Sequence, residues 1–290
     1  MAGVDINRTT TNVVLPEEVS AEIWAAMLED SAFMQLARKI NIPGTGLKIQ
    51  TITGEPVADW VEETTAKPVS THTFDKKTIV PYKLAVIEPF SNEFRRDKAA
   101  LYAECVARAP KALGRKFDET IMGTTAPGTG FDVLGGAQTV SLTPSGTDSV
   151  YTQFLAADAL ISAADGIMDG IGLAPQGKSK VLAAVDGQGR PLFTPGVGSN
   201  TVGDILGAKV TVNKGLYVAG SPNTVGIAGD FENAVWGSVE GIQVAISDQA
   251  TLVNGEETIN LWQQNMFAVR FEIEVAFAVK DVDQFVLLTD

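Results

Sequence analysis

The chain has 290 residues, 45% of them hydrophobic, and a formal net charge of −13 at pH 7. This length and apolar content allow one large domain or two intertwined ones, and they exclude a disordered chain. The acidic charge excludes nucleic-acid binding through a general basic field, although such a protein can still enclose nucleic acid. No apolar run approaches the length of a membrane span, and the first residues lack a signal-peptide pattern.

Cysteine and histidine are each present once, which restricts the available chemistry. Cys105 alone excludes an internal disulfide framework and indicates a reducing compartment. A single His72 removes most metal sites built on His and Cys, so we predict no metal and no cofactor. A hydrolase that uses His72 in a Ser-His-Asp triad is an alternative. His72 lies in a Thr/Ser-rich stretch, however, which is typical of an exposed loop.

The N-terminal region predicts an arm followed by helices. Residues 1–15 show no periodicity beyond a short apolar run, and we interpret them as an extended arm. Pro16 and the two acidic residues after it are typical of a helix start, and that helix is predicted to run to about Glu29. A second short helix is predicted from Ser31 to Lys39, capped by Ser31 or Asp30.

Two β-rich runs then flank a long polar stretch. Leu47–Thr53 and Thr78–Pro89 are separated by over twenty residues, too many for an ordinary hairpin turn. We predict a two-stranded ribbon that leaves the body. Isolated hairpins are marginally stable in water, so the ribbon is expected to lean on another copy of the protein. The predicted inter-subunit contacts are Trp60, Glu62, Glu63, Lys67, Lys76 and Lys77.

The next segment predicts a single long helix from Asn92 to Met122. Its apolar residues recur at spacings of three and four, which places them on one face. Pro110 inside the helix predicts a kink, because proline removes a hydrogen bond and clashes with the preceding turn.

From Asp148 the pattern indicates a second, glycine-rich α+β unit. It opens with a helix capped by Asp148 or Ser149. The predicted short strands are Lys180–Val185, Val210–Val212, Thr224–Ala228 and Ile242–Ile246.

The last long strand has the most regular pattern of the chain. Every odd position from Phe267 to Val279 is apolar, and the even positions carry charges or alanine. This alternation predicts a strand with one buried face and one wet, charged face.

In this order, the elements resemble those of the major capsid proteins of tailed phages, the HK97-type fold. No single motif is specific, and the shared order over nearly the whole chain carries the resemblance. The matching pieces are Trp60–Lys76, Phe117–Gly123, Gly187–Leu192 with Leu206–Val210, Gly229–Phe231 with Trp236 and Gly241–Val244, and Asn265 through Phe285.

The resemblance implies an α+β fold with an N-terminal arm, an extended E-loop hairpin, a P domain built on a long spine helix and long β-strands, and an A domain. The implied boundaries are 1–15 for the arm, 16–43 for the N-terminal helices, 44–91 for the E-loop and its flanking strands, 92–147 for the spine helix and following strand, 148–253 for the A domain, and 254–290 for the return to the P domain.

The resemblance also implies a function. The chain would be a major capsid protein that self-assembles in the host cytoplasm into the hexamers and pentamers of an icosahedral virion head. Double-stranded DNA would lie inside, bound without sequence preference, and a portal would join the shell. Because Met1 stands almost directly at the arm, we expect a separate scaffolding protein; a decoration protein is left open. An acidic inner wall would let DNA slide, a hypothesis that a strongly basic wall would contradict.

One constellation offers chemistry in a chain that is otherwise predicted not to be an enzyme. In the founding member of the family, an E-loop lysine forms an isopeptide bond with a P-domain asparagine, assisted by a glutamate. The matching positions are Lys67, Asn265 and Glu272. Strand parity places Asn265 and Glu272 on opposite faces unless the strand starts late or bulges. The alternative is that Lys67 and Glu272 are surface charges and Asn265 is a turn residue.

Two further alternatives keep a related architecture. An encapsulin-like nanocompartment shell would have the same fold and would enclose an enzyme instead of DNA. A tail-tube or other virion protein is disfavoured by the long ribbon followed by a kinked helix.

Overall fold

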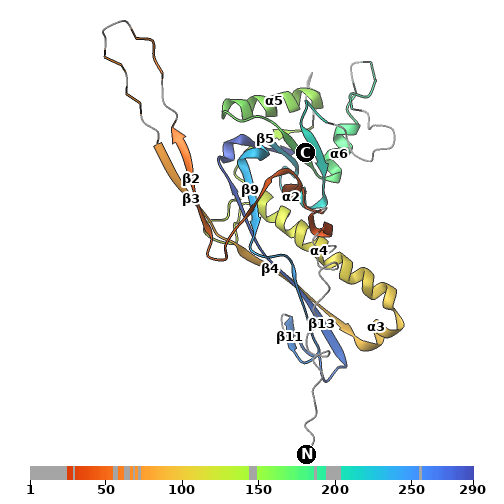
Figure 1. Cartoon of the computed structure of the whole chain (residues 1–290). Coiled ribbons are helices and arrows are strands. Elements are labelled where there is room, and N and C mark those ends of the chain that lie inside the picture. Colours follow the sequence, from red (N-terminus) through yellow and green to blue (C-terminus); the bar gives the residue numbers. More distant parts are fainter. Residues whose placement is uncertain are drawn as a thin grey trace, which may run out of the picture.

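The computed structural model describes residues 25–28, 30–54, 58–61, 66–67, 69–70, 73–143, 149–185, 188–193, 204–254 and 257–290. The predicted arm, most of the helix predicted over residues 16–29, and His72 lie outside these ranges. Across the described part of the chain, two five-stranded sheets and two separate hairpins are present (Figure 1).

The first sheet is organised around β13 (Met266–Val279), which confirms the predicted long strand. β4 (Tyr82–Ser91) pairs antiparallel along one edge of β13. β10 (Gln243–Ser247) and β9 (Ala234–Ser238) share its other edge, and β1 (Arg38–Asn41) lies parallel to β9. β13 therefore joins β4 to β9 and β10, which lie far from β4 in the sequence.

Both faces of the second half of β13 are buried, so the predicted wet face is wrong there. Phe271 and Phe277 belong to the main apolar core, which also contains Phe117 of the long helix. Ala276 and Ala278 point to the opposite face, where they pack in a small core beneath the ribbon. Alanine suits that face because only a small side chain lets the ribbon approach closely. A charged face exists only farther back, around Glu272.

The helices of the first half differ in detail from the prediction. α2 (Ala32–Leu36) is capped by Ser31 as expected, but it ends early because residues from Arg38 pair with β9. The predicted single helix is split into α3 (Asn92–Asp97) and α4 (Ala99–Met122) by non-helical Lys98. α4 runs continuously through Pro110.

The second sheet has the strand order β5-β14-β8-β6-β7. α5, capped by Ser149 as predicted, packs against it and shares its apolar core. The bounds are β5 (Gln138–Ser141), α5 (Val150–Ala163), β6 (Gly170–Leu173), α6 (Pro175–Leu182), β7 (Lys209–Val212), β8 (Thr224–Gly229) and β14 (Phe285–Thr289).

Two strand predictions in this region are wrong. The segment predicted as a strand over Lys180–Val185 instead begins with the last three residues of α6, because Pro175 in the first turn of that helix presets the helical φ. The alternating strand does not continue to Phe285. It stops at Val279, and a 3₁₀ turn capped by Asp281 turns the chain into β14 of the second sheet.

The ribbon consists of β2 (Leu47–Gly54) and β3 (Thr73–Ile79), paired antiparallel, and it projects from the body (Figure 1). The run predicted as one strand over Thr78–Pro89 is split near Pro81, since proline cannot donate to a ladder. A second hairpin, β11 (Thr251–Asn254) and β12 (Glu257–Asn260), precedes β13. The remaining 3₁₀ turns are η1 (Lys214–Leu216), η2 (Phe231–Asn233) and η3 (Val282–Gln284).

The two sheets interleave along the chain. β5 and β14, from the regions predicted as 92–147 and 254–290, belong to the second sheet, while β9 and β10, from 148–253, belong to the first. The two sheets are therefore tied together by the chain itself at several points. Among the described helices, none combines the length and the apolar character needed to cross a bilayer.

Candidate assembly surfaces

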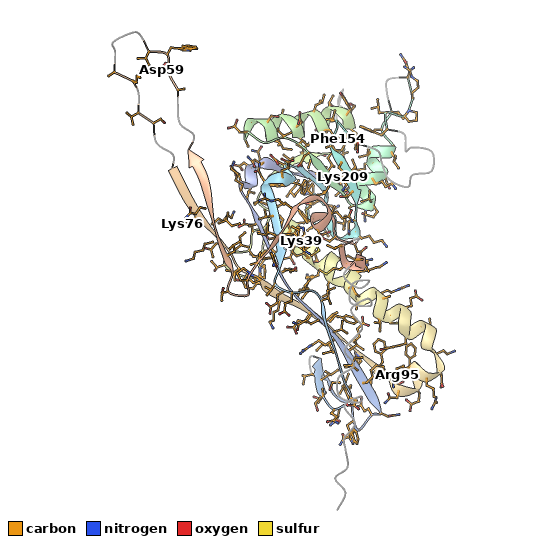
Figure 2. All side chains as sticks on the ribbon, in the orientation of Figure 1. Lys39, Asp59, Lys76, Arg95, Phe154 and Lys209 are labelled. Atoms are coloured by element: carbon orange, nitrogen blue, oxygen red, sulfur yellow. The ribbon has the colours of Figure 1, made fainter. Side chains whose placement is uncertain are left out.

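The far end of the ribbon presents apolar side chains to solvent. Trp60 is 101% exposed and Val69 is 92% exposed. Figure 2 places the neighbouring Asp59 at the end of the ribbon most distant from the body. The predicted contact residue Lys67 is also exposed, whereas Glu62 and Glu63 lie outside the described residues. A fully exposed tryptophan on a projecting ribbon is typical of a surface that another molecule covers.

The base of the ribbon is clamped to the body by Lys77. Its ammonium donates to the carbonyl of Val279 at the end of β13 and forms an ion pair with Asp132. Asp132 also accepts a hydrogen bond from the Val279 N–H at 2.9 Å. These described contacts of Lys77 are internal to the subunit. Its neighbour Lys76 is exposed on β3 (Figure 2).

Two glycines allow the chain to turn sharply beside this clamp. Gly46 and Gly130 both have a φ of +84°, the left-handed region that favours glycine. A Cβ on Gly46 would lie 2.6 Å from the carbonyl oxygen of Ile79, and one on Gly130 would lie 2.9 Å from Val80 Cγ2. The Val80 N–H donates to the Gly130 carbonyl at 3.0 Å. Both loops therefore close tightly on the point where the ribbon meets the body.

Asn265 is held in a polar cluster at the start of β13. It has a φ of +53°, which asparagine tolerates better than most residues. Its side-chain amide donates to Glu93 Oε1 at 2.6 Å and accepts from Asn92 Nδ2 at 2.9 Å. Asn265 thus fastens the turn before β13 to the first residues of α3.

Glu272 occupies a different environment. Lys83 on β4 donates to Glu272 Oε1 at 2.8 Å and pairs with Glu274 at 3.2 Å, and Arg270 lies 3.5 Å from Glu272. The hydrogen bond from Lys83 lowers the pKa of the Glu272 carboxyl. Seven residues of strand, roughly 23 Å, separate Glu272 from Asn265. The fold of one subunit therefore does not bring the three predicted cross-linking residues together.

Asp118 of α4 anchors the N-terminal segment. Its carboxylate is fully buried and accepts from Ser31 Oγ at 2.6 Å, from the Ala32 N–H at 2.7 Å and from the Phe33 N–H at 3.4 Å. It thereby satisfies the orphan donors at the start of α2. Burial raises the pKa of Asp118 to about 7 despite these three hydrogen bonds.

Comparison with known proteins identifies the class of molecule that this architecture defines. The major capsid protein gp17 of Mycobacterium phage L5, described as probable, is 32% identical over 95% of this chain and 89% of its own length. The counterpart from Mycobacterium phage D29 is 30% identical, over 95% and 90%. A solved structure from Mycobacterium phage Ogopogo aligns with a TM-score of 0.73 and 19% identity, covering 90% of this chain and 92% of the other.

The fold is therefore that of a viral shell subunit. The model of the phage capsid family matches residues 11–290, and the chain belongs to that family. Its function is that of a major capsid protein of a tailed phage, which confirms the class predicted from the order of elements. The encapsulin alternative is not favoured.

Several structural residues were not anticipated from the sequence. Asp132, Asn92 and Glu93 all act on partners more than 100 residues away, and no local pattern marks them. Lys83 and Glu272 carry opposite charges on two paired strands. Their proximity can be recognised only once the β4–β13 register is known. Within the described ranges, no group of three or more His, Cys, Asp or Glu residues is arranged to hold a metal ion.

Proposed function

We propose that this chain builds the icosahedral head of a tailed double-stranded DNA phage, as hexamers and pentamers of one subunit. The observation that carries this is the ribbon. Its far end buries little within its own subunit, and Trp60 there is fully exposed. Since isolated hairpins are marginal in water, the ribbon gains burial when a neighbouring copy covers it.

The HK97-type domain assignment accounts for the pieces of the fold. In this proposal residues 1–15 are the arm, β2 and β3 form the E-loop, and α4 with β4 and β13 forms the P domain. The second sheet with α5 and α6 forms most of the A domain. The shell assembles in the host cytoplasm with a portal and a separate scaffolding protein, and it encloses DNA without reading its sequence.

We propose that the shell is held together without covalent cross-links and that the chain is not an enzyme. The cross-linking chemistry needs a free asparagine amide and a carboxylate able to take up a proton. The Asn265 amide is already hydrogen-bonded to Glu93, and the ion pair with Lys83 favours the charged form of Glu272. Assembled shells boiled in SDS should run as single chains. Ladders of multimers that disappear in a Lys67→Arg variant would show that the cross-link forms.

Electron microscopy of the expressed chain, with and without a co-expressed scaffolding protein, tests the shell itself. Closed particles that show five-fold and six-fold clusters of subunits are expected. A chain that stays a compact monomer at high concentration, with or without the scaffold, would refute the proposal. Extracting the contents of native particles separates a DNA-filled head from a compartment that carries protein cargo.

A further inference from the structure

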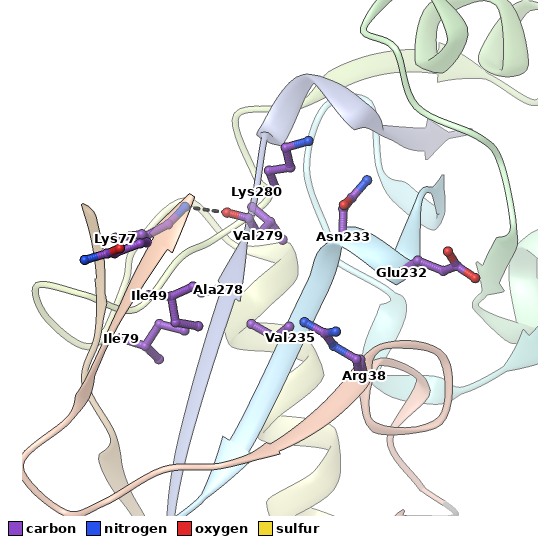
Figure 3. Close-up of a pocket in the computed structure, with 11 residues that line it drawn as sticks. Arg38, Ile49, Lys77, Ile79, Glu232, Asn233, Val235, Ala278, Val279 and Lys280 are labelled. Carbon is purple, nitrogen blue, oxygen red and sulfur yellow. Dashed lines mark hydrogen bonds between the residues drawn. The ribbon is translucent and has the colours of Figure 1, made fainter. Parts of the chain in front are cut away.

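A pocket of about 390 Å³ opens where the ribbon diverges from the first sheet (Figure 3). Its floor is apolar. Val235 of β9 and Ala278 of β13 are paired in register, and they face Ile49 and Ile79 at the ribbon base. These apolar lining residues of the pocket also belong to, or pack against, the small core beneath the ribbon.

The rim of this pocket is positively charged. Arg38 and Lys280 line it, both exposed, and neither side chain has an ion-pair partner among the described residues. Lys77 also lines the pocket but is engaged by Asp132, and Glu232 is the single acidic residue among the lining residues. In a chain with a net charge of −13, two unpaired cations beside an apolar floor favour an occupant that is apolar and acidic.

The end of the ribbon has that chemistry. Trp60 is the most exposed of the large hydrophobic residues in the described ranges, and Asp59 precedes it. In the sequence from Asp59 to Lys67, three residues are acidic and one is basic. A tryptophan flanked by carboxylates matches an apolar floor rimmed by arginine and lysine, and buried tryptophans are frequent anchors of interfaces.

The occupant must come from another copy. β2 and β3 stay paired from Ile49 out to Gly54, which carries the chain roughly 17 Å from the pocket before the end of the ribbon begins. Asp59 accordingly lies at the far extremity of the ribbon (Figure 2). With Asp59 at the far end of the ribbon, Trp60 next to it stands away from the pocket of its own copy, which leaves a second copy as the occupant.

We propose that Trp60 of one copy inserts into the pocket at the ribbon base of its neighbour, with Asp59 beside Arg38. This inference rests on the proposed self-assembly and names the contact that carries it. Each copy has one ribbon end and one pocket, so the contact is head-to-tail, and repetition about an axis closes a ring.

Charge reversal in separate chains tests the contact. Two variants that restore assembly when mixed must both be folded, so a loss of assembly by either alone is then not a loss of folding. Asp59→Arg alone and Arg38→Glu alone should each reduce assembly about tenfold, since each places like charges together. A 1:1 mixture of the two variants should recover six-membered rings, because an alternating ring with an even number of copies pairs every arginine with an acid, whereas a five-membered ring keeps at least one like-charged contact. Light scattering and electron microscopy measure both. If wild type assembles and the mixture does no better than either variant, the docking is refuted and the shell function stands. If wild type fails to assemble, both the docking contact and the proposed shell function are refuted.

A second measurement identifies the occupant. In a Cys105→Ser background, a Gln50→Cys thiol at the pocket should resist alkylation in assembled particles. Trp60→Ala should expose it, and Trp60→Phe should preserve much of the protection. Removal of residues 1–15 should leave the protection intact. Protection that depends on residues 1–15 and not on Trp60 would show that the arm fills the pocket, which would overturn the proposal.

Discussion

The buried carboxylate of Asp118 should make the stability of the subunit depend on pH in an unusual direction. The pKa of Asp118 rises from 3.8 to about 7 on folding, because burial disfavours the charged form. The folded state therefore holds this proton more tightly than the unfolded state does. For this group, stability is greatest below pH 4, falls as the pH rises towards 7, and is constant above that.

The size of the effect follows from the shift. A change from 3.8 to about 7 corresponds to about 4 kcal/mol of unfolding free energy lost between pH 4 and pH 8. An Asp118→Asn side chain does not titrate, so its own stability lacks this component. The amide loses one acceptor for the α2 N–H groups, which costs about 1–3 kcal/mol. At pH 4 the variant should be clearly less stable than wild type, and the deficit should shrink or reverse by pH 8.

Urea unfolding of unassembled subunits, followed by tryptophan fluorescence, gives the free energies at each pH. The control is Glu119→Gln, which removes the next carboxylate on the exposed side of the same helix and should keep the wild-type pH dependence. A difference between wild type and Asp118→Asn that stays constant from pH 4 to pH 8 would refute the reasoning, since it would mean that Asp118 is ionised in the fold throughout.

Three other changes probe the ribbon and the start of β13. Lys77→Met should cost about 1 kcal/mol and speed hydrogen exchange at the ribbon base, whereas Lys76→Met should change stability by less than about 0.5 kcal/mol; equal effects would argue against the clamp. Ala278→Leu should overpack the small core beneath the ribbon and cost about 1–3 kcal/mol in denaturant unfolding, while the same change at exposed Ala85 is expected to be near neutral, and a harmless Ala278→Leu would contradict the close approach. Asn265→Asp places a second carboxylate beside the glutamate that now accepts its N–H, so thermal stability should drop at pH 7 and recover in acid; a loss that is independent of pH would exclude charge repulsion as its cause.

The alternation of β13 and the helix caps could be predicted from the sequence, whereas the pairing of strands far apart in the chain could not. Ser149 marked a helix start and the 267–279 pattern marked a strand, since both signals are local. The alanines at 276 and 278 looked like a solvent face because nothing nearby in the sequence shows that a ribbon from residues 47–79 covers them.

The same limit explains the missed contacts. Arg38–Asn41 became a strand because it pairs with β9, about 200 residues later, which overrode a helical reading. The resemblance supplied Asn265 and Glu272 as a pair. In the structure, Lys83 lies opposite Glu274 on the paired strands and its side chain also reaches Glu272, while the turn before β13 places Asn265 against Glu93. Sequence order identified the family; register decides what each side chain touches.

The tight turns at Gly46 and Gly130 restrict the junction between the ribbon and the body to a few residues around Val80. From Ile49 to Gly54 the paired strands extend roughly 17 Å, so a swing of about 10° at this junction moves their far end by roughly 3 Å. In the proposed shell, such a change in a few backbone torsions would let one amino-acid sequence meet its neighbours at slightly different angles. The tilt between adjoining subunits of that shell, and with it the curvature of the wall, would be set at this junction of a few residues.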